Sequence, residues 1–191
     1  AGVSGKKYRR RKYHMAGYIC KIVIENTHPP VWRRVIVPER ITFEELHEMI
    51  QILFSWGNEH LHEFEVPGDR IYISDQEDTW ANYYNDKWLR YTYDFGGNWR
   101  HRINIEKIDE EYQERRATLL KFKGDNFTED RALGEDNVRN TFDSAKVEQK
   151  LNGMNLTLHE ELQQVKLLKE RLYDLTENLK RLFELDSDVL Q

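Results

Sequence analysis

The sequence is poor in cysteine and in long apolar runs, and both shortages exclude whole classes of protein. Among its 191 residues Cys20 is the one cysteine, so one chain can form neither a disulfide framework nor a cysteine-based zinc site. The longest apolar run, residues 18–24, is short and interrupted by Lys21, which excludes a membrane-spanning helix there. The basic N-terminus is not followed by the unbroken apolar segment of a secretory signal. The sequence therefore predicts a cytoplasmic protein that makes no membrane contact.

Signatures of the common enzyme classes are also missing. The chain has no phosphate-binding loop, no Rossmann glycine pattern and no Gly-x-Ser-x-Gly nucleophile elbow. Asp94-Phe95-Gly96 matches the metal-binding tripeptide of protein kinases, but the glycine-rich and His-Arg-Asp loops that accompany it in kinases are absent. Cys20 lies inside an apolar run and is interpreted as a core residue, not as a nucleophile. These absences favour a protein that is not an enzyme.

Charge is distributed unevenly along the chain. The whole sequence has 29 Lys and Arg against 34 Asp and Glu, a net charge of -5. Residues 1–15 contain bases and no acid, so the remainder is considerably more acidic than the average suggests. A flexible basic arm of this kind binds nucleic acid through counterion release, or it remains a solvated tail. The candidate nucleic-acid contacts are Lys6, Lys7, Arg9, Arg10, Arg11 and Lys12.

Patterning in the first two thirds of the chain predicts a mostly antiparallel sheet. Residues 17–25 and 31–37 are rich in β-branched side chains, and residues 60–66 and 99–106 alternate between apolar or aromatic and polar positions. Thr42 and Glu45 form a capping box that opens a helix after the second strand. Because one face of the strand at 99–106 is polar, one face of the sheet meets water, which favours antiparallel pairing.

After Ile108 the composition reads as helical. A helix is predicted from Glu135 to Leu151, and a second capping box at 157–160 opens another that extends to about Leu185. The sequence thus predicts an α+β fold with a C-terminal helical hairpin, divided into an arm (1–15), a domain (16–153) and a final helix (154–191). The apolar stripe of that helix packs on the domain or forms a homodimer interface. Its members follow a heptad rhythm: Val165, Leu168, Leu172, Leu175, Leu179 and Leu182.

Four of the seven histidines are predicted on inward faces, which raises the hypothesis of a metal site. His60 and His62 share one side of a strand, as two ligands on a sheet must. His47 and His101 supply further imidazoles, and Asp94 a carboxylate. A divalent metal such as zinc would make the protein a metal-dependent hydrolase or nuclease. The alternative is that these are core histidines with hydrogen-bonded ring nitrogens and that the protein has no cofactor.

Several motifs in a specific order make the sequence recognisable. They are Pro29-Pro30-Val31-Trp32-Arg33-Arg34, Leu46-His47-Glu48-Met49-Ile50-Gln51, Trp56 with His60-Leu61-His62-Glu63-Phe64, and Tyr91-Thr92-Tyr93-Asp94-Phe95-Gly96 with Trp99 and His101. Together they resemble the plasmid pRiA4b ORF-3-like family of bacteria and archaea over about residues 17–151. The resemblance implies an α+β domain with a mixed or antiparallel sheet. It also implies a prokaryotic protein associated with plasmids or mobile elements.

Two departures from the family pattern bear on activity. Family members usually have a second aspartate where this chain has Gly97, and the family's Pro-Pro-Glu-Asp segment is reduced to Phe127-Thr128-Glu129-Asp130. If those acids serve a metal-dependent reaction in relatives, this chain lacks part of the set. We therefore expect a non-catalytic binding or accessory module. Its candidate ligand-facing residues are Trp32, Arg33, Arg34, Tyr93, Asp94 and Trp99.

Overall fold

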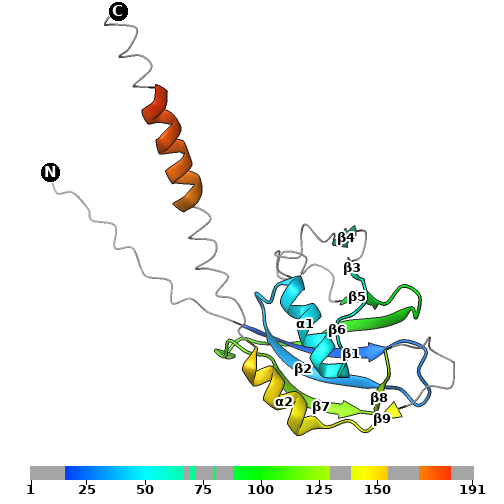
Figure 1. Cartoon of the computed structure of the whole chain (residues 1–191). Helices are drawn as coiled ribbons and strands as arrows, with labels where there is room; N and C mark the ends of the chain where they lie inside the picture. The colour runs from blue at the N-terminus through cyan, green and yellow to red at the C-terminus, as the bar shows by residue number, and fades with distance from the viewer. Residues whose placement is uncertain are drawn as a thin grey trace, which may run out of the picture. The chain divides into compact units, whose positions relative to one another are not determined.

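The computed structural model describes residues 16–66, 69–71, 80, 88–129, 139–154 and 168–181. The chain divides into two compact units, residues 1–156 and 157–191 (Figure 1). The basic arm, with its six candidate nucleic-acid contacts, lies outside the described residues. Within the described ranges, no helix combines the length and the apolar character needed to cross a membrane.

An antiparallel sheet is the framework of the first unit, and the α+β class predicted from the sequence is confirmed. The described strands form a seven-stranded sheet in the order β4-β3-β5-β6-β1-β2-β7 (Figure 1). A separate two-stranded ribbon pairs β8 with β9. The strands are β1 (Gly17–Ile24), β2 (Trp32–Pro38), β3 (His62–Val66), β4 (Asp69–Ile71), β5 (Trp88–Tyr93), β6 (Trp99–Asp109), β7 (Thr118–Lys123), β8 (Asn126–Phe127) and β9 (Arg139–Asn140). The helical character expected after Ile108 is wrong for β7, β8 and β9, because these segments pair with other strands.

Helix α1 (Phe43–Phe54) follows β2, where the sequence predicts it. Its capping box is formed: the Glu45 amide donates to Thr42 Oγ1 at 3.1 Å, and the Thr42 amide donates to Glu45 Oε2 at 2.9 Å. The helix ends at Ser55, whose φ of 58° lies in the left-handed region that stops helices.

Helix α2 (Ser144–Gly153) is shorter than predicted. The sequence places its start at Glu135, which is wrong, because Arg139 and Asn140 pair with β8 as strand β9. Asp143 is the N-cap and accepts a hydrogen bond from the Lys146 amide at 3.0 Å. The local cap therefore determines where the helix begins, against the helical composition upstream.

The second unit contains a helix at residues 168–181. Four leucines of the predicted heptad stripe fall on this helix and are more than half exposed: Leu168, Leu172, Leu175 and Leu179. Val165 and Leu182, the ends of the stripe, lie outside the described residues. A dimer through this helix stays a prediction.

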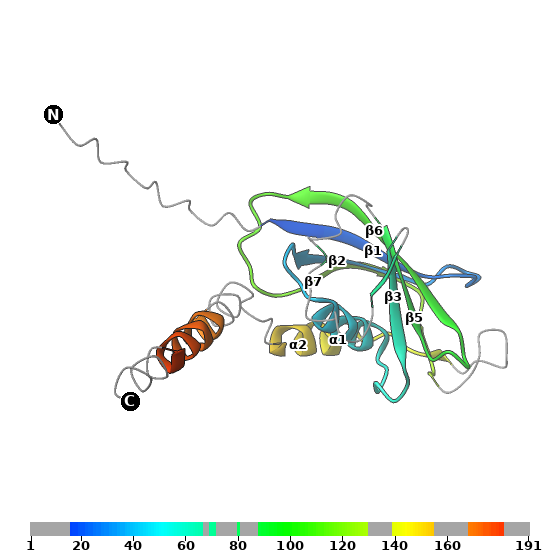
Figure 2. The same cartoon turned by 90° about the horizontal axis from the view of Figure 1, so that it is seen from above.

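The two faces of the seven-stranded sheet have different surroundings. Figure 2 shows α1 and α2 on the same side of the sheet, and we call the opposite side the open face. Along β6 the predicted alternation is confirmed: Trp99, His101 and Ile103 are buried towards the helices, whereas Arg100 and Arg102 are half-buried on the open face. The helix-covered side is the core, where Ile22, Val35, Phe54 and Phe64 are fully buried.

Candidate functional site

Two loops meet at one end of the sheet and form what we call the tip, residues 55–61 and 94–98. The Asp94 amide donates to the Leu61 carbonyl at 2.9 Å, which joins the loops. Leu61 is 66% exposed and Phe95 is 52% exposed, so two large apolar side chains project beside this junction. Asn58, Asp94 and Asn98 have positive φ, a conformation that Asn and Asp adopt more readily than most residues.

Glu129 holds the tip through hydrogen bonds to Gly57 and Tyr93. Its carboxylate accepts the Gly57 amide through both oxygens, at 2.9 and 3.0 Å, and the Tyr93 hydroxyl at 2.9 Å. The Tyr93 hydroxyl in turn accepts the amides of Glu59 and His60 at 2.9 and 3.2 Å. Burial, followed by the hydrogen bond to Glu129, raises the pKa of Tyr93 to about 12, so the phenol keeps the proton it donates.

Two tryptophans support this anchor. Trp56 stacks on Tyr93 at 5.1 Å between ring centroids and donates its indole N–H to the Phe127 carbonyl at 2.9 Å. The Trp99 indole N–H donates to the Glu129 carbonyl at 3.3 Å. Each ring therefore fills the core and satisfies its polar atom, which fixes the segment that carries Glu129.

A buried hydrogen-bond network connects α1 to the tip. Gln51 Nε2 donates to the Tyr91 hydroxyl at 2.9 Å, so that hydroxyl donates its own proton to His47 Nδ1 at 2.7 Å. His47 Nε2 then donates to Asn58 Oδ1 at 2.8 Å. Burial, with the nearby His62, lowers the pKa of His47 to about 4, so the ring is neutral and its proton is on Nε2. His47 is therefore a satisfied link in the network.

The four predicted metal ligands are not brought to one point. His62 stacks on His47 with centroids 3.5 Å apart and planes 5° from parallel. A metal bonds in the ring plane at about 2.0–2.1 Å, so one ion cannot serve both rings in this arrangement. His60 lies at the tip, with Nδ1 4.0 Å from Asp94 Oδ1. In the parts of the chain that are described, no three His, Cys, Asp or Glu side chains are placed to hold an ion.

His101 lies apart from the other three histidines. Its Nδ1 donates to the Trp99 carbonyl at 3.1 Å, and its ring packs between Phe54, Trp56 and Tyr91. Burial lowers the pKa of His101 to about 3. The inward position predicted for it is right, and its role is that of a neutral core residue.

Arg33, predicted to face a ligand, is instead fully buried. Its guanidinium donates to the Leu53 carbonyl at 3.3 Å, the Lys123 carbonyl at 3.0 Å and Asn126 Oδ1 at 2.6 Å. It also lies 3.9 Å from the centre of the Phe142 ring. Burial lowers its pKa to about 10. Arg33 therefore joins β2, the end of α1 and the segment after β7, and it has no surface to offer a ligand.

The other predicted ligand-facing residues divide in the same way. Tyr93 and Trp99 are fully buried, so they support the tip without reaching its surface. Asp94 is half-buried at the tip, and Trp32 and Arg34 are half-buried on the open face. The sequence pattern identifies this region but does not separate supporting residues from surface residues.

Gly97, where this chain departs from the family pattern, lies against the Asp94 side chain. A Cβ at this position would lie 2.5 Å from Asp94 Oδ2 and 3.0 Å from Trp99 Nε1. With Asp94 in its present position, an aspartate at 97 does not fit. The Asp94 side chain thus occupies space that the missing carboxylate would need.

Glu129, Gln51 and Asn58 are the site residues that sequence reasoning missed. Glu129 stands in the eroded acidic segment and Gln51 ends a family motif, but neither position indicates its hydrogen-bond partner. Glu129 meets Gly57 across 72 residues of chain, a distance that no local pattern can bridge. Asn58 has no signal beyond its position in a loop.

Comparisons with known proteins agree with this fold. The chain is 33% identical over 102 residues to "Uncharacterized protein y4hQ" of Sinorhizobium fredii, covering 46% of this chain and 52% of the relative. It therefore spans about half the length of that curated relative. A crystal structure of "Protein of Unknown Function MM3350" from Methanosarcina mazei Go1 is similar with a TM-score of 0.58 and 30% identity, covering 61% of this chain and 75% of the other.

The family profile described as "Plasmid pRiA4b ORF-3-like protein" matches residues 16–176. The match begins next to β1 and extends into the helix at 168–181. It therefore continues beyond residue 151, where the resemblance based on the motifs ends. It covers most of the chain, which therefore belongs to the plasmid pRiA4b ORF-3-like family.

Proposed function

We propose that this protein is a non-catalytic binding module whose tip holds an apolar segment of a partner protein. The observation that carries the proposal is the pair Leu61 and Phe95, both more than half exposed and joined by the hydrogen bond between Asp94 and Leu61. Adjacent exposed apolar side chains rimmed by polar groups are typical of binding sites.

The charge around the tip defines the partner. Glu59 is exposed, Asp94 is half-buried, and the Glu129 carboxylate contacts Gly57, whereas residues 55–61 and 94–98 contain neither Lys nor Arg. Such a rim attracts cations and repels acids. The expected partner segment therefore combines apolar side chains with Lys or Arg.

The rigidity of the tip supports binding over reaction. Glu129, Tyr93 and Asn58 tie residues 55–61 to the core, and the Asp94 amide links residues 94–98 to Leu61, so little conformational freedom is lost when a partner docks. His47 uses both ring nitrogens in these hydrogen bonds, so neither nitrogen is available to a substrate. We propose an accessory role linked to plasmids or mobile elements, supported by the plasmid in the family's description.

The test is selection of peptides of about twelve residues from a phage-displayed random library on the full chain. We expect enriched peptides to contain apolar and basic residues and to bind the double variant L61S/F95S at least tenfold more weakly. L120S is the matched control, because Leu120 is 48% exposed on β7, away from the tip. Failure to enrich any peptide, or peptides that bind the double variant normally, contradicts the tip as the site.

The non-catalytic part of the proposal has its own test. The full chain is assayed with single-stranded DNA and a phosphodiester chromogen in the presence of zinc, alongside H62A. We expect no turnover above a protein-free blank. Turnover that is abolished in H62A would show that the protein is an enzyme and would contradict the non-catalytic proposal.

A further inference from the structure

The open face of the sheet has a chemistry distinct from that of the rest of the molecule. Strand alternation places Lys21 and Arg34 of β1 and β2, Arg90, Arg100 and Arg102 of β5 and β6, and Lys121 and Lys123 of β7 on this side. The acidic residues on it include Glu25, Glu63, Glu65 and Glu106. Among the described open-face residues, bases thus outnumber acids, although the chain as a whole is acidic.

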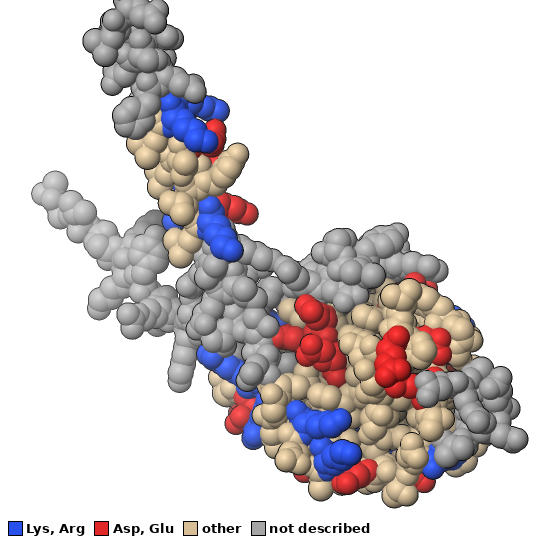
Figure 3. Space-filling view, in the orientation of Figure 1, with Lys and Arg blue, Asp and Glu red and all other residues tan. Residues whose placement is uncertain are grey.

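The helix side has the opposite appearance. Figure 3 views that side and shows acidic side chains gathered in patches over the upper part of the first unit. Glu44 and Glu48 of α1 are exposed there, and burial, followed by the nearby Glu44 and Glu45, raises the pKa of Glu48. A polyanion would therefore be repelled from α1 and attracted to the open face.

Three of the acids on the open face, Glu25, Glu65 and Glu106, are held in ion pairs. Arg34 forms a paired contact with Glu106, with Nε–Oε2 at 2.6 Å and Nη2–Oε1 at 2.9 Å. Arg90 lies between Glu25 at 3.6 Å and Glu65 at 3.4 Å, towards β3. The positive charge therefore increases from β3 towards β7, where Lys121 and Lys123 are both exposed.

Two tryptophans lie among these Lys and Arg side chains. Lys21 Nζ is 4.9 Å and Arg34 Cζ is 5.3 Å from the ring centroid of Trp32, and Arg102 Cζ is 3.5 Å from that of Trp88. Both indoles are half-buried. The other tryptophans, Trp56, Trp80 and Trp99, are buried. The open face thus presents flat aromatic rings next to cations.

The strand register arranges these groups in rows across the sheet. Lys123 pairs with Trp32, Trp32 with Val23, and Val23 with Arg102. The next row on the face runs from Lys121 through Arg34 and Lys21 to Asn104 and Trp88. Neighbouring strands are about 4.8 Å apart, so each row extends across about 15–20 Å. That length accommodates several nucleotides of an extended strand.

We propose that the open face binds single-stranded nucleic acid. Lys21, Lys121 and Lys123 contact phosphates, and bases stack on Trp32 and Trp88. Basic surfaces interleaved with aromatic rings bind single strands in this way, because every base has a stacking face and the backbone carries the charge. A duplex is disfavoured, since its bases are stacked on one another and are unavailable to the indoles.

The test is fluorescence anisotropy of a labelled oligothymidylate of about 20 nucleotides with the full chain, between about 50 and 200 mM salt. We expect salt-dependent binding and a weaker complex with a duplex of the same length. K121Q/K123Q should reduce the salt slope by about 0.7 for each lost phosphate contact. W32A should weaken binding about fivefold or more.

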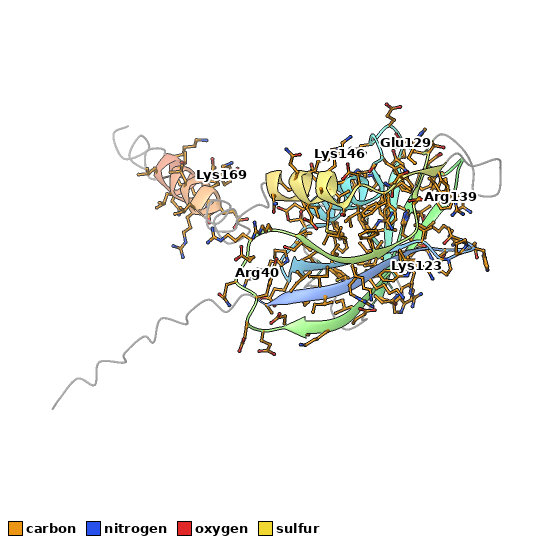
Figure 4. All side chains as sticks on the ribbon, turned by 90° about the horizontal axis from the view of Figure 1, so that it is seen from below. Arg40, Lys123, Glu129, Arg139, Lys146 and Lys169 are labelled. Carbon is orange, nitrogen blue, oxygen red and sulfur yellow. The ribbon has the colours of Figure 1, made fainter. Side chains whose placement is uncertain are left out.

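Two controls separate this face from other basic regions. K146Q/K150Q removes the same charge from exposed positions on α2, and Figure 4 shows Lys146 on that helix, apart from Lys123. Replacing all six bases of residues 1–15 by glutamine in the full chain removes the charge of the arm. K146Q/K150Q should weaken binding less than K121Q/K123Q does. In the chain with the six arm replacements, K121Q/K123Q and W32A should still weaken binding.

Three results would overturn the proposal: no binding of the oligothymidylate, binding that disappears with the six arm replacements alone, or tighter binding of the duplex. Equal losses in K121Q/K123Q and K146Q/K150Q would also overturn it, because they would show attraction without a defined site. Circular dichroism of each variant checks that the fold is retained.

Discussion

Two adjacent arginines of β2 show how differently the two sides of the sheet use the same side chain. Arg33 is buried on the helix side, where it donates to carbonyl and amide oxygens and lies against Phe142. Arg34 points to the open face, where it pairs with Glu106, with about a third of each side chain exposed. One arginine is part of the core, and the other belongs to a solvated surface.

The difference teaches where function can lie. On the helix side, Glu129, His47 and Arg33 have their polar atoms matched to partners within the chain, so this side determines shape. On the open face, cations lie against indoles that are only half-buried. The contacts on the helix side therefore hold the tip in place, and we expect binding at the exposed surfaces.

The largest expected effect is on stability, from R33A. The change leaves the Leu53 and Lys123 carbonyls and Asn126 without their donor and opens space beside Phe142. We expect a loss of about 3–5 kcal/mol in the free energy of unfolding. Urea denaturation measures it. R33K should not restore stability, because a lysine cannot reproduce the fork of donors; full rescue by R33K would show that charge alone matters.

Acid should destabilise the helix side through its histidines. The pKa values of His47 and His101 fall from 6.5 to about 4 and about 3 on folding, so the unfolded chain binds more protons below about pH 6.5. Stability then decreases as pH falls, by up to about 1.4 kcal/mol per pH unit for each histidine. Unfolding curves between about pH 7 and 5 test this. H101L should have a shallower pH dependence than the original chain, and an unchanged slope would contradict the assignment.

A smaller effect is expected at the anchor of the tip. E129Q replaces one accepting oxygen by an NH₂ group that cannot accept from Gly57 or Tyr93. We expect a loss of about 1–2 kcal/mol in unfolding free energy. Amide hydrogen exchange should increase at Gly57, Glu59 and His60, with β1 and β2 unchanged. If amide exchange at Gly57, Glu59 and His60 were the same in E129Q as in the original chain, Glu129 would not hold the tip.

The smallest effect should come from R34A. Its ion pair with Glu106 is solvated, and such pairs contribute about 0–1 kcal/mol. Denaturation by urea should show a loss below about 1 kcal/mol. A loss comparable to that of R33A would remove the distinction between the two sides of the sheet.

Local rules predict much of this fold and little of its site. The capping box at Thr42 and the alternation from Trp99 to Glu106 are encoded within a few residues, so they are readable. The side of Arg33 is also readable, because it alternates with Arg34. That an arginine there is buried is not readable, because its partners lie 20 to 93 residues away.

The histidines illustrate the same limit. Alternation places His62 and His101 on the inward face, but the distance between rings depends on how α1 packs on β3 and β5. That packing stacks His47 on His62 and leaves His101 beside Phe54 and Trp56. The face on which each histidine lies follows from the periodicity of the strand. Whether the histidine rings come together depends on the tertiary structure.

Fluorine NMR of the full chain labelled with 5-fluorotryptophan tests the contrast between the two sides most directly. Of the five tryptophans, Trp32 and Trp88 lie on the open face, and Trp56, Trp80 and Trp99 are buried. On titration with an oligothymidylate, the resonances of Trp32 and Trp88 should shift while the other three stay in place. Shifts confined to the buried tryptophans, or no shift at saturating oligonucleotide, would contradict the account.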